Sequence, residues 1–222
     1  MRKFVMNAAY LAIFLAVIMT IVTCALCGSI LTWMKTPNQF YQGAYDYLFV
    51  IFLGIPFTFL YNVVAGIIRS LGDSKTPFYF LVLSAVMNIF LDMLFIIVFK
   101  LGTAGAGWAT ILSQAISGVL CFRYMKKKYD ILKTNHQERR LDMHYIKTLF
   151  TMAVPMGLQF SITAIGSILL QSAVNTLGAV YVSAFAAATK VKQLAMCPYD
   201  GFATASATFG SQNLGAGNLK RI

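Results

Sequence analysis

The stretch PFYFLVLSAVMNIFLDMLFIIVF, residues 77–99, is a long apolar segment that contains a single acid, Asp92. A helix rises about 1.5 Å per residue and the hydrocarbon core of a bilayer is about 30 Å thick, so this segment is long enough to cross a membrane. A carboxylate at that depth costs roughly 2.5 kcal/mol or more, and we expect it to face protein or a water-filled cavity. Asn88 lies on the same helix face, four residues earlier. The pair predicts either a proton or cation site or an acid satisfied by an interhelical hydrogen bond.

The composition of the whole chain also indicates a membrane protein. The chain is 59% hydrophobic and 11% charged, whereas a soluble domain has about 25% charged residues. A soluble fold of 222 residues has no place to bury so much apolar surface. The sequence therefore predicts an all-α polytopic membrane bundle of about six transmembrane helices, at residues 8–33, 44–68, 77–99, 104–122, 148–172 and 180–209.

A net charge of +11 would suggest nucleic-acid binding in a soluble protein. Here the positions of the basic residues match the predicted membrane topology instead. Basic residues gather before the first span, between the second and third, between the fourth and fifth, and at the end of the chain. The positive-inside rule places these segments, and both termini, in the cytoplasm. We expect anionic lipid headgroups, and no nucleic acid, as their partners. The largest group is Arg123, Lys126, Lys127, Lys128, Lys133, Arg139, Arg140 and Lys147.

The same polar segment, residues 123–147, is the predicted boundary between two domains, 1–122 and 148–222. Proline occurs within or near the ends of three predicted spans, as Pro56, Pro155 and Pro198. A proline inside a helix removes a backbone hydrogen bond, which predicts kinked membrane helices.

Polar residues recur on two of the predicted spans. In the fourth span, Thr110 shares one helix face with three others, and that face is positioned to meet Asn88 and Asp92 on the preceding antiparallel helix. The three are Ser113, Gln114 and Ser117.

The fifth span carries a polar residue at every fourth position, which traces a slow spiral around the helix. This spiral fits the wall of a water-filled cavity and a crossing helix partner equally well. In the sixth span, Lys190 and Lys192 are either cavity residues or basic side chains that extend toward the outer surface. The residues of the spiral are Gln159, Thr163, Ser167, Gln171 and Asn175.

Residue types typical of enzymes and metal sites are sparse within the spans. Both histidines, His136 and His144, fall in the polar segment, and Cys24 and Cys27 have no second Cys or His pair near them. The sequence has no nucleotide-binding loop. We therefore expect no enzymatic activity, no metal site and no cofactor.

Six stretches together resemble the multidrug and toxic compound extrusion (MATE) family, in its bacterial branch similar to the DinF-like exporters. The similarity runs the length of the chain. The stretches are LYNVVAGIIRSLGDSKTPFYF (60–80), MNIFLDMLF (87–95), GAGWATILSQ (105–114), AVPMGLQ (153–159), LLQSAVNTLG (169–178) and GSQNLGAGN (210–218).

The resemblance implies a partial two-lobe fold. The family has twelve spans in two six-helix lobes, and this chain resembles spans three to eight. Residues 1–122 would be the last four helices of the first lobe, 123–147 the inter-lobe loop, and 148–222 the first two helices of the second lobe. The chain is thus expected to be a fragment that lacks the acid of the family's first helix.

Residue by residue, the resemblance assigns an ion-coupling site. Asn88 and Asp92 match the asparagine and aspartate of the first lobe's fifth helix, Thr110 a hydroxyl of its sixth helix, and Asn62 an asparagine of its fourth. In the sodium-coupled branch of the family the second lobe carries an acid at the position of Gln159. The glutamine therefore argues against a sodium site of that type in the second lobe.

The resemblance also implies the function. The whole protein would be a proton- or sodium-coupled exporter of amphipathic, often cationic compounds, multi-pass in the bacterial inner membrane and monomeric at full length. Gln159, Thr163, Gln171 and Lys190 would line its substrate cavity. Two alternatives remain: a flippase for lipid-linked saccharides in the same superfamily, and a non-transporting membrane subunit.

Overall fold

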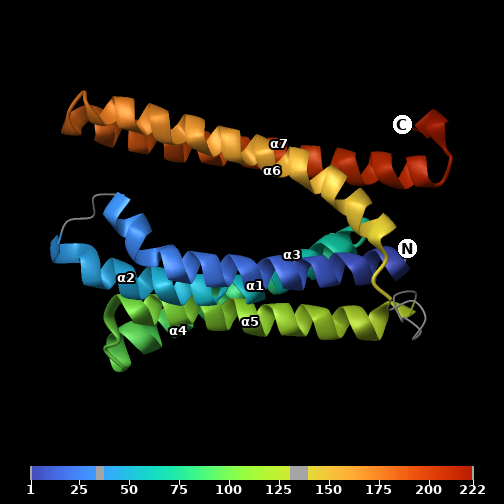
Figure 1. The fold of residues 1–222 in the computed structure, drawn as a ribbon, viewed down its shortest axis with the longest axis horizontal. Coiled ribbons are helices and arrows are strands. Elements are labelled where there is room, and N and C mark those ends of the chain that lie inside the picture. The colour runs from blue at the N-terminus through green and yellow to red at the C-terminus, as the bar shows by residue number, and fades with distance from the viewer. Residues whose placement is uncertain (1, 34–37, 131–139, 222) are drawn as a thin grey trace. The chain divides into compact units, whose positions relative to one another are not determined.

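The computed structural model describes residues 2–33, 38–130 and 140–221, and helices make up nearly all of this part of the chain (Figure 1). The predicted all-α class is confirmed. A short π-helix, η1 (Met93–Val98), continues the fourth helix, and a 3-10 turn, η4 (Leu219–Arg221), follows the last. The α-helices are α1 (Arg2–Trp33), α2 (Asn38–Leu53), α3 (Ile55–Ser70), α4 (Lys75–Asp92), α5 (Gly102–Lys128), α6 (Met143–Asn175) and α7 (Ala179–Gly215).

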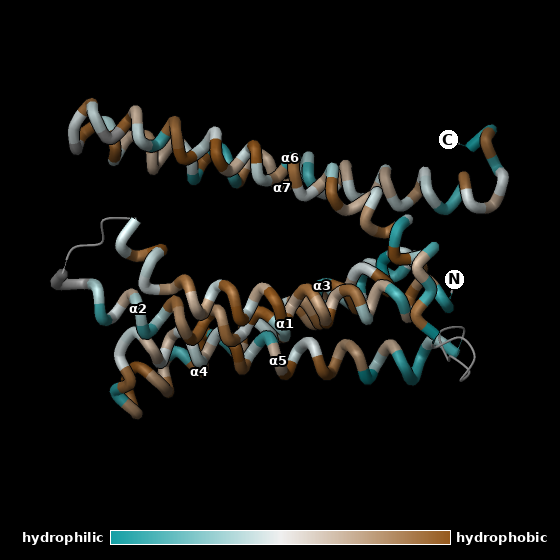
Figure 2. The backbone as a smooth tube through the Cα atoms, viewed as in Figure 1, coloured by the Kyte–Doolittle hydropathy of each residue, from teal (hydrophilic) through white to brown (hydrophobic). Residues whose placement is uncertain are grey.

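Four described helices are long and apolar enough to cross a membrane: α1, α4 with η1, α5 and α6. The pair α2–α3 adds a fifth span if it is counted as one. Figure 2 shows the apolar residues distributed along these helices. The sixth predicted span corresponds to α7, which is not among them and carries Lys190, Lys192 and Asp200. Its crossing of the membrane therefore stays a prediction.

The predicted second span, 44–68, is two helices that meet at Gly54 with a bend of 44°. Pro56 lies in the first turn of α3, where its missing N–H has no helical partner to lose. The bend thus lies two residues before Pro56, near the place where a kink is expected. Pro155 and Pro198 instead lie inside α6 and α7, and both helices continue past them.

The chain divides into two compact units, Met1–Ile146 and Lys147–Ile222. In the first unit α5 packs against α2, α3 and α4. The buried positions of α5 are mostly small, which lets the neighbouring helix backbones approach closely. They include Gly105, Gly107, Ala109, Ser113, Ser117 and Gly118.

The polar segment predicted at 123–147 is partly helical at both ends. The helix α5 continues to Lys128, and α6 begins at Met143, so His144 lies in a helix rather than in a loop. Lys133, His136 and Arg139 lie outside the described residues.

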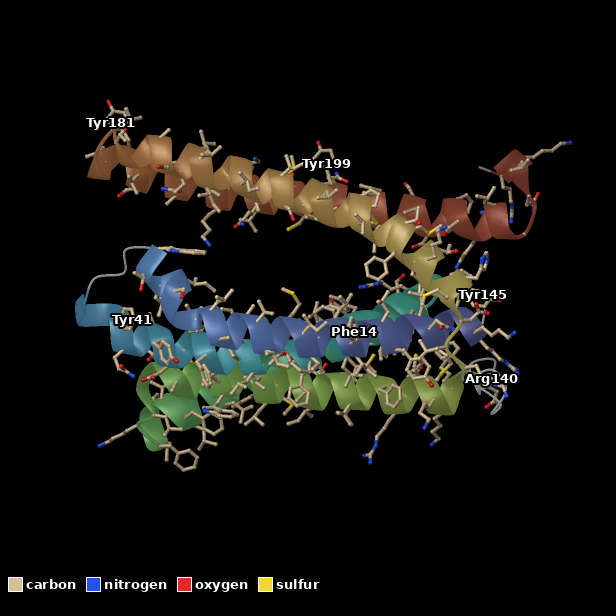
Figure 3. The ribbon with its side chains drawn as sticks, in the orientation of Figure 1. Phe14, Tyr41, Arg140, Tyr145, Tyr181 and Tyr199 are labelled. Carbon is tan, nitrogen blue, oxygen red and sulfur yellow. The ribbon has the colours of Figure 1, made fainter. Side chains whose placement is uncertain are left out.

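The start of α6 is held against α1 within the first unit. The buried Asn7 accepts a hydrogen bond from the backbone N–H of Asp142 through Oδ1, at 3.0 Å. The Asp142 carboxylate in turn accepts from the N–H of His144, as a capping residue does. The rings of Phe4 and Tyr145, the latter labelled in Figure 3, meet edge to face at 4.7 Å.

Candidate functional site

The polar face of α5 meets α4 at Thr110. The Nδ2 atom of Asn88 donates to Oγ1 of Thr110 at 3.4 Å, and that hydroxyl donates to the carbonyl of Ala106 at 3.0 Å. The predicted meeting of these two residues is confirmed. Asn88 lies about one turn before Asp92 on the same face of α4. The contact therefore brings the Thr110 hydroxyl of α5 to the face of α4 that also carries the acid.

Asp92 is the last residue of α4, and its Oδ1 atom is buried without a hydrogen-bond partner among the described residues. Buried polar atoms almost always have a partner, so an unpaired carboxylate oxygen points to a proton, a cation, a water molecule or a further side chain. The π-helix η1 begins at the next residue, and π-bulges are frequent at functional sites. In the described part of the chain, no cluster of three or more His, Cys, Asp or Glu residues is arranged to hold a metal ion.

The other residues of the α5 face are divided between two neighbours. Ser117 donates to the carbonyl of Phe80 on α4 at 2.6 Å, whereas Gln114 accepts from the hydroxyl of Thr58 on α3 at 2.5 Å. The buried Ser113 donates to the carbonyl of Thr110 in its own helix. The face expected to meet α4 therefore contacts α3 as well.

Asn62 is exposed on α3, and its Nδ2 atom donates to the carbonyl of Thr58 in its own helix at 2.9 Å. The structure thus joins Asn88 to Thr110 but gives Asn62 a separate partner. Its membership of the site remains a prediction.

The predicted substrate-cavity residues lie in the second unit. Gln159, Thr163 and Lys190 are exposed, and Gln171 is partly buried. The hydroxyl of Thr163 donates to the carbonyl of Gln159 at 2.9 Å, so part of the polar spiral is satisfied within α6 itself. These contacts fit both a cavity wall and a helix interface, and the cavity assignment also stays a prediction.

A second polar cluster, centred on Asp73, was not anticipated from the sequence. The acid lies in the turn between α3 and α4 and accepts hydrogen bonds from Thr76, through both its N–H at 3.0 Å and its hydroxyl at 2.7 Å. It also accepts from Tyr129 at 2.8 Å and from Lys128 at 3.2 Å. The spacing Asp73–Thr76 was a readable helix-start signal, but Lys128 and Tyr129 lie more than fifty residues away.

These hydrogen bonds hold the pKa of the Asp73 carboxyl well below its ordinary value of 3.8, the N–H of Thr76 contributing most. An acid with a lowered folded pKa stabilises the fold above its unfolded pKa, and this stabilisation is lost as the pH falls through the folded pKa.

We expect Asp73→Asn to lower the free energy of unfolding by about 1–2 kcal/mol at neutral pH. The difference should shrink below about pH 4. Unfolding in detergent micelles at several pH values measures it, and a difference that grows in acid would contradict it.

Comparison with known proteins identifies the family. The profile of the family described as MatE matches residues 1–94 and 155–222. The chain is 35% identical over 193 residues to the "Probable multidrug resistance protein YpnP" of Bacillus subtilis (strain 168). That match covers 87% of this chain and 43% of the relative. A second protein of that organism, "Probable multidrug resistance protein YoeA", is 30% identical over 215 residues, or 94% of this chain and 46% of the relative.

Solved structures agree with this match in fold. A transporter of the MOP superfamily from Pyrococcus furiosus Vc1 (DSM3638) superposes with a TM-score of 0.91 at 24% identity, over 99% of this chain and 49% of that one. A MATE structure in complex with MaD3S gives 0.90 at 23% identity, over 99% and 50%. The chain thus spans about half the length of the relatives and structures it matches. Because the family profile covers most of the chain, the protein belongs to the MatE family of multidrug and toxic compound extrusion proteins.

Proposed function

We propose that this chain is part of a secondary active exporter that uses a proton or sodium gradient to extrude amphipathic, often cationic compounds. The observation that carries the proposal is the buried, unpaired Oδ1 atom of Asp92, within an apolar membrane helix and one turn from the Asn88–Thr110 hydrogen bond. The similarity to two multidrug resistance proteins of Bacillus subtilis supports the substrate class.

In this mechanism Asp92 binds and releases the coupling ion, H⁺ or Na⁺, during the transport cycle. A bare carboxylate is costly at membrane depth, so binding of H⁺ or Na⁺ lowers the free energy of the state in which the acid is buried. Asn88 and Thr110 then offer an amide and a hydroxyl beside the neutralised acid. A change of charge at the junction of α4 and η1 would favour a different packing of α4 on α5 and release substrate outward.

The remaining assignments follow from the same proposal. Residues 1–122 supply four helices of a first lobe, 123–147 the connection, and 148–222 two helices of a second lobe, with Gln159, Thr163, Gln171 and Lys190 facing substrate. The protein resides in the bacterial inner membrane with both termini cytoplasmic, acts as a monomer at full length, and uses a coupling ion rather than a cofactor.

Transport by the full-length protein in proteoliposomes tests the proposal. A pH gradient and a sodium gradient are imposed separately, and accumulation of a fluorescent cationic dye is recorded. We expect one of the two gradients to drive dye movement, and an ionophore for that ion to abolish it. Dye movement that depends on neither gradient would contradict coupled export.

A further inference from the structure

An apolar groove runs along the first unit between α1, α3 and α5. It extends from Val5 to Val17 on α1 and from Pro56 to Ile67 on α3, and Phe122 and Met125 of α5 complete its wall. Its volume is about 310 Å³, and every side chain that lines it is apolar. An apolar cavity offers no hydrogen bonds to water and instead favours an apolar occupant.

The dimensions of the groove select the kind of occupant. Val5 and Val17 are twelve residues apart, which is about 18 Å along a helix, close to the roughly 15 Å depth of one leaflet's hydrocarbon. The groove is therefore long enough to hold one acyl chain of a phospholipid along its length.

One end of the groove is positively charged. The Nζ atom of Lys126 lies 5.6 Å from the centre of the Phe122 ring, which forms part of the groove wall. Lys126 is exposed in the last turn of α5, next to Lys127. Its neighbour Lys128 is instead bound to Asp73. The groove therefore begins beside a cation at the basic end of the helices and continues into the apolar region.

We propose that this groove binds one acyl chain of an anionic phospholipid whose headgroup contacts Lys126. The lipid belongs to the leaflet at the basic ends of α1 and α5. Neither the transport proposal nor Asp92 is needed for this site, because the groove is lined by α1, α3 and the end of α5, whereas the polar contact joins Asn88 of α4 to Thr110 near the start of α5.

The apolar part is tested by filling the groove. Ala12 lines it on α1, whereas Ala25 on the same helix is exposed and outside it. In the full-length protein in detergent, Ala12→Leu should weaken retention of both phosphatidylglycerol and phosphatidylcholine about tenfold. This equals the loss of about two buried methylenes at about 0.8 kcal/mol each. Ala25→Leu should leave retention unchanged. Native mass spectrometry with each lipid measures the affinities.

The charged part is tested by Lys126→Gln, with Lys127→Gln as the matched surface control. Lys126→Gln should weaken phosphatidylglycerol about fivefold, the equivalent of about 1 kcal/mol for one basic residue near an anionic surface, and should leave phosphatidylcholine unchanged. Equal effects of the two lysine variants on phosphatidylglycerol would overturn the assignment of the headgroup to Lys126.

The position of the lipid is tested by a phosphatidylglycerol with a photoreactive acyl chain. Crosslinks should map to residues 5–17 or 56–67. Unchanged affinities in Ala12→Leu, or crosslinks of a protein segment from outside this chain to the groove, would overturn the proposal. The second result would show that another part of the protein fills it.

Discussion

Replacing Asp92 with asparagine is expected to abolish ion-driven export while leaving the protein folded. Asparagine has nearly the same shape as aspartate but carries no negative charge, so it cannot exchange a proton and offers a cation only a neutral amide oxygen. We expect gradient-driven dye transport in proteoliposomes to fall on the order of a hundredfold, as for loss of a group that transfers a proton. Because the change removes a costly buried charge, stability should not decrease.

The same chemical change at Asp46 serves as the control. Asp46 lies on α2 and accepts a hydrogen bond from Gln42 at 2.9 Å, so its carboxylate already has a partner in its own helix. Asp46→Asn should transport close to normally. Normal coupled transport by Asp92→Asn would contradict the assignment of Asp92 as the ion-coupling residue. An equal loss of transport in both variants would contradict it as well.

The sequence predicted the contact between Asn88 and Thr110 because both positions follow from helix periodicity and an antiparallel hairpin. That logic applies to neighbouring helices joined by a short connection. It gave no partner for Gln114, which binds Thr58 from a helix 56 residues away in sequence. Helix periodicity identifies the polar face of a helix but does not say which distant helix covers it.

The cluster around Asp73 was missed for a related reason. Asp73 and Thr76 are close in sequence and typical of a helix start, but the cluster depends on where α5 ends. The apolar pattern of the sequence predicts that the fourth span ends at residue 122, whereas α5 continues to Lys128. That extra length brings Lys128 and Tyr129 to Asp73, and it also positions Lys126 at the apolar groove.

Two features accompany the bend between α2 and α3, and of these only the proline, Pro56, could be predicted from the sequence. The other is space at Gly54, where φ is −77° and any residue is conformationally acceptable. A Cβ atom at this position would lie 2.5 Å from Cγ1 and 2.9 Å from Cδ1 of Ile111, a buried residue of α5. The carbonyl of Ile51 would be 3.1 Å away. Glycine is required here by the close approach of α5.

Gly54→Ala is therefore expected to lower the free energy of unfolding by about 1–3 kcal/mol, the range for overpacking a filled interior. Gly66→Ala is the matched control, because no atom lies within 4 Å of a Cβ added at that position in α3. That control should be neutral or stabilising by up to about 1 kcal/mol, since alanine favours a helix over glycine. Thermal unfolding in detergent micelles compares the two.

A double variant separates the steric cause from a general effect on the bend. Ile111→Ala removes both atoms that the new methyl group would meet, at a cost of its own of about 2–5 kcal/mol. If the clash with Ile111 is the cause, adding Gly54→Ala to Ile111→Ala should lower stability little further, and the two changes should be strongly non-additive. Additive losses would place the strain instead at the carbonyl of Ile51 in the backbone of α2. In that case the glycine would be required by the bend itself rather than by the neighbouring helix.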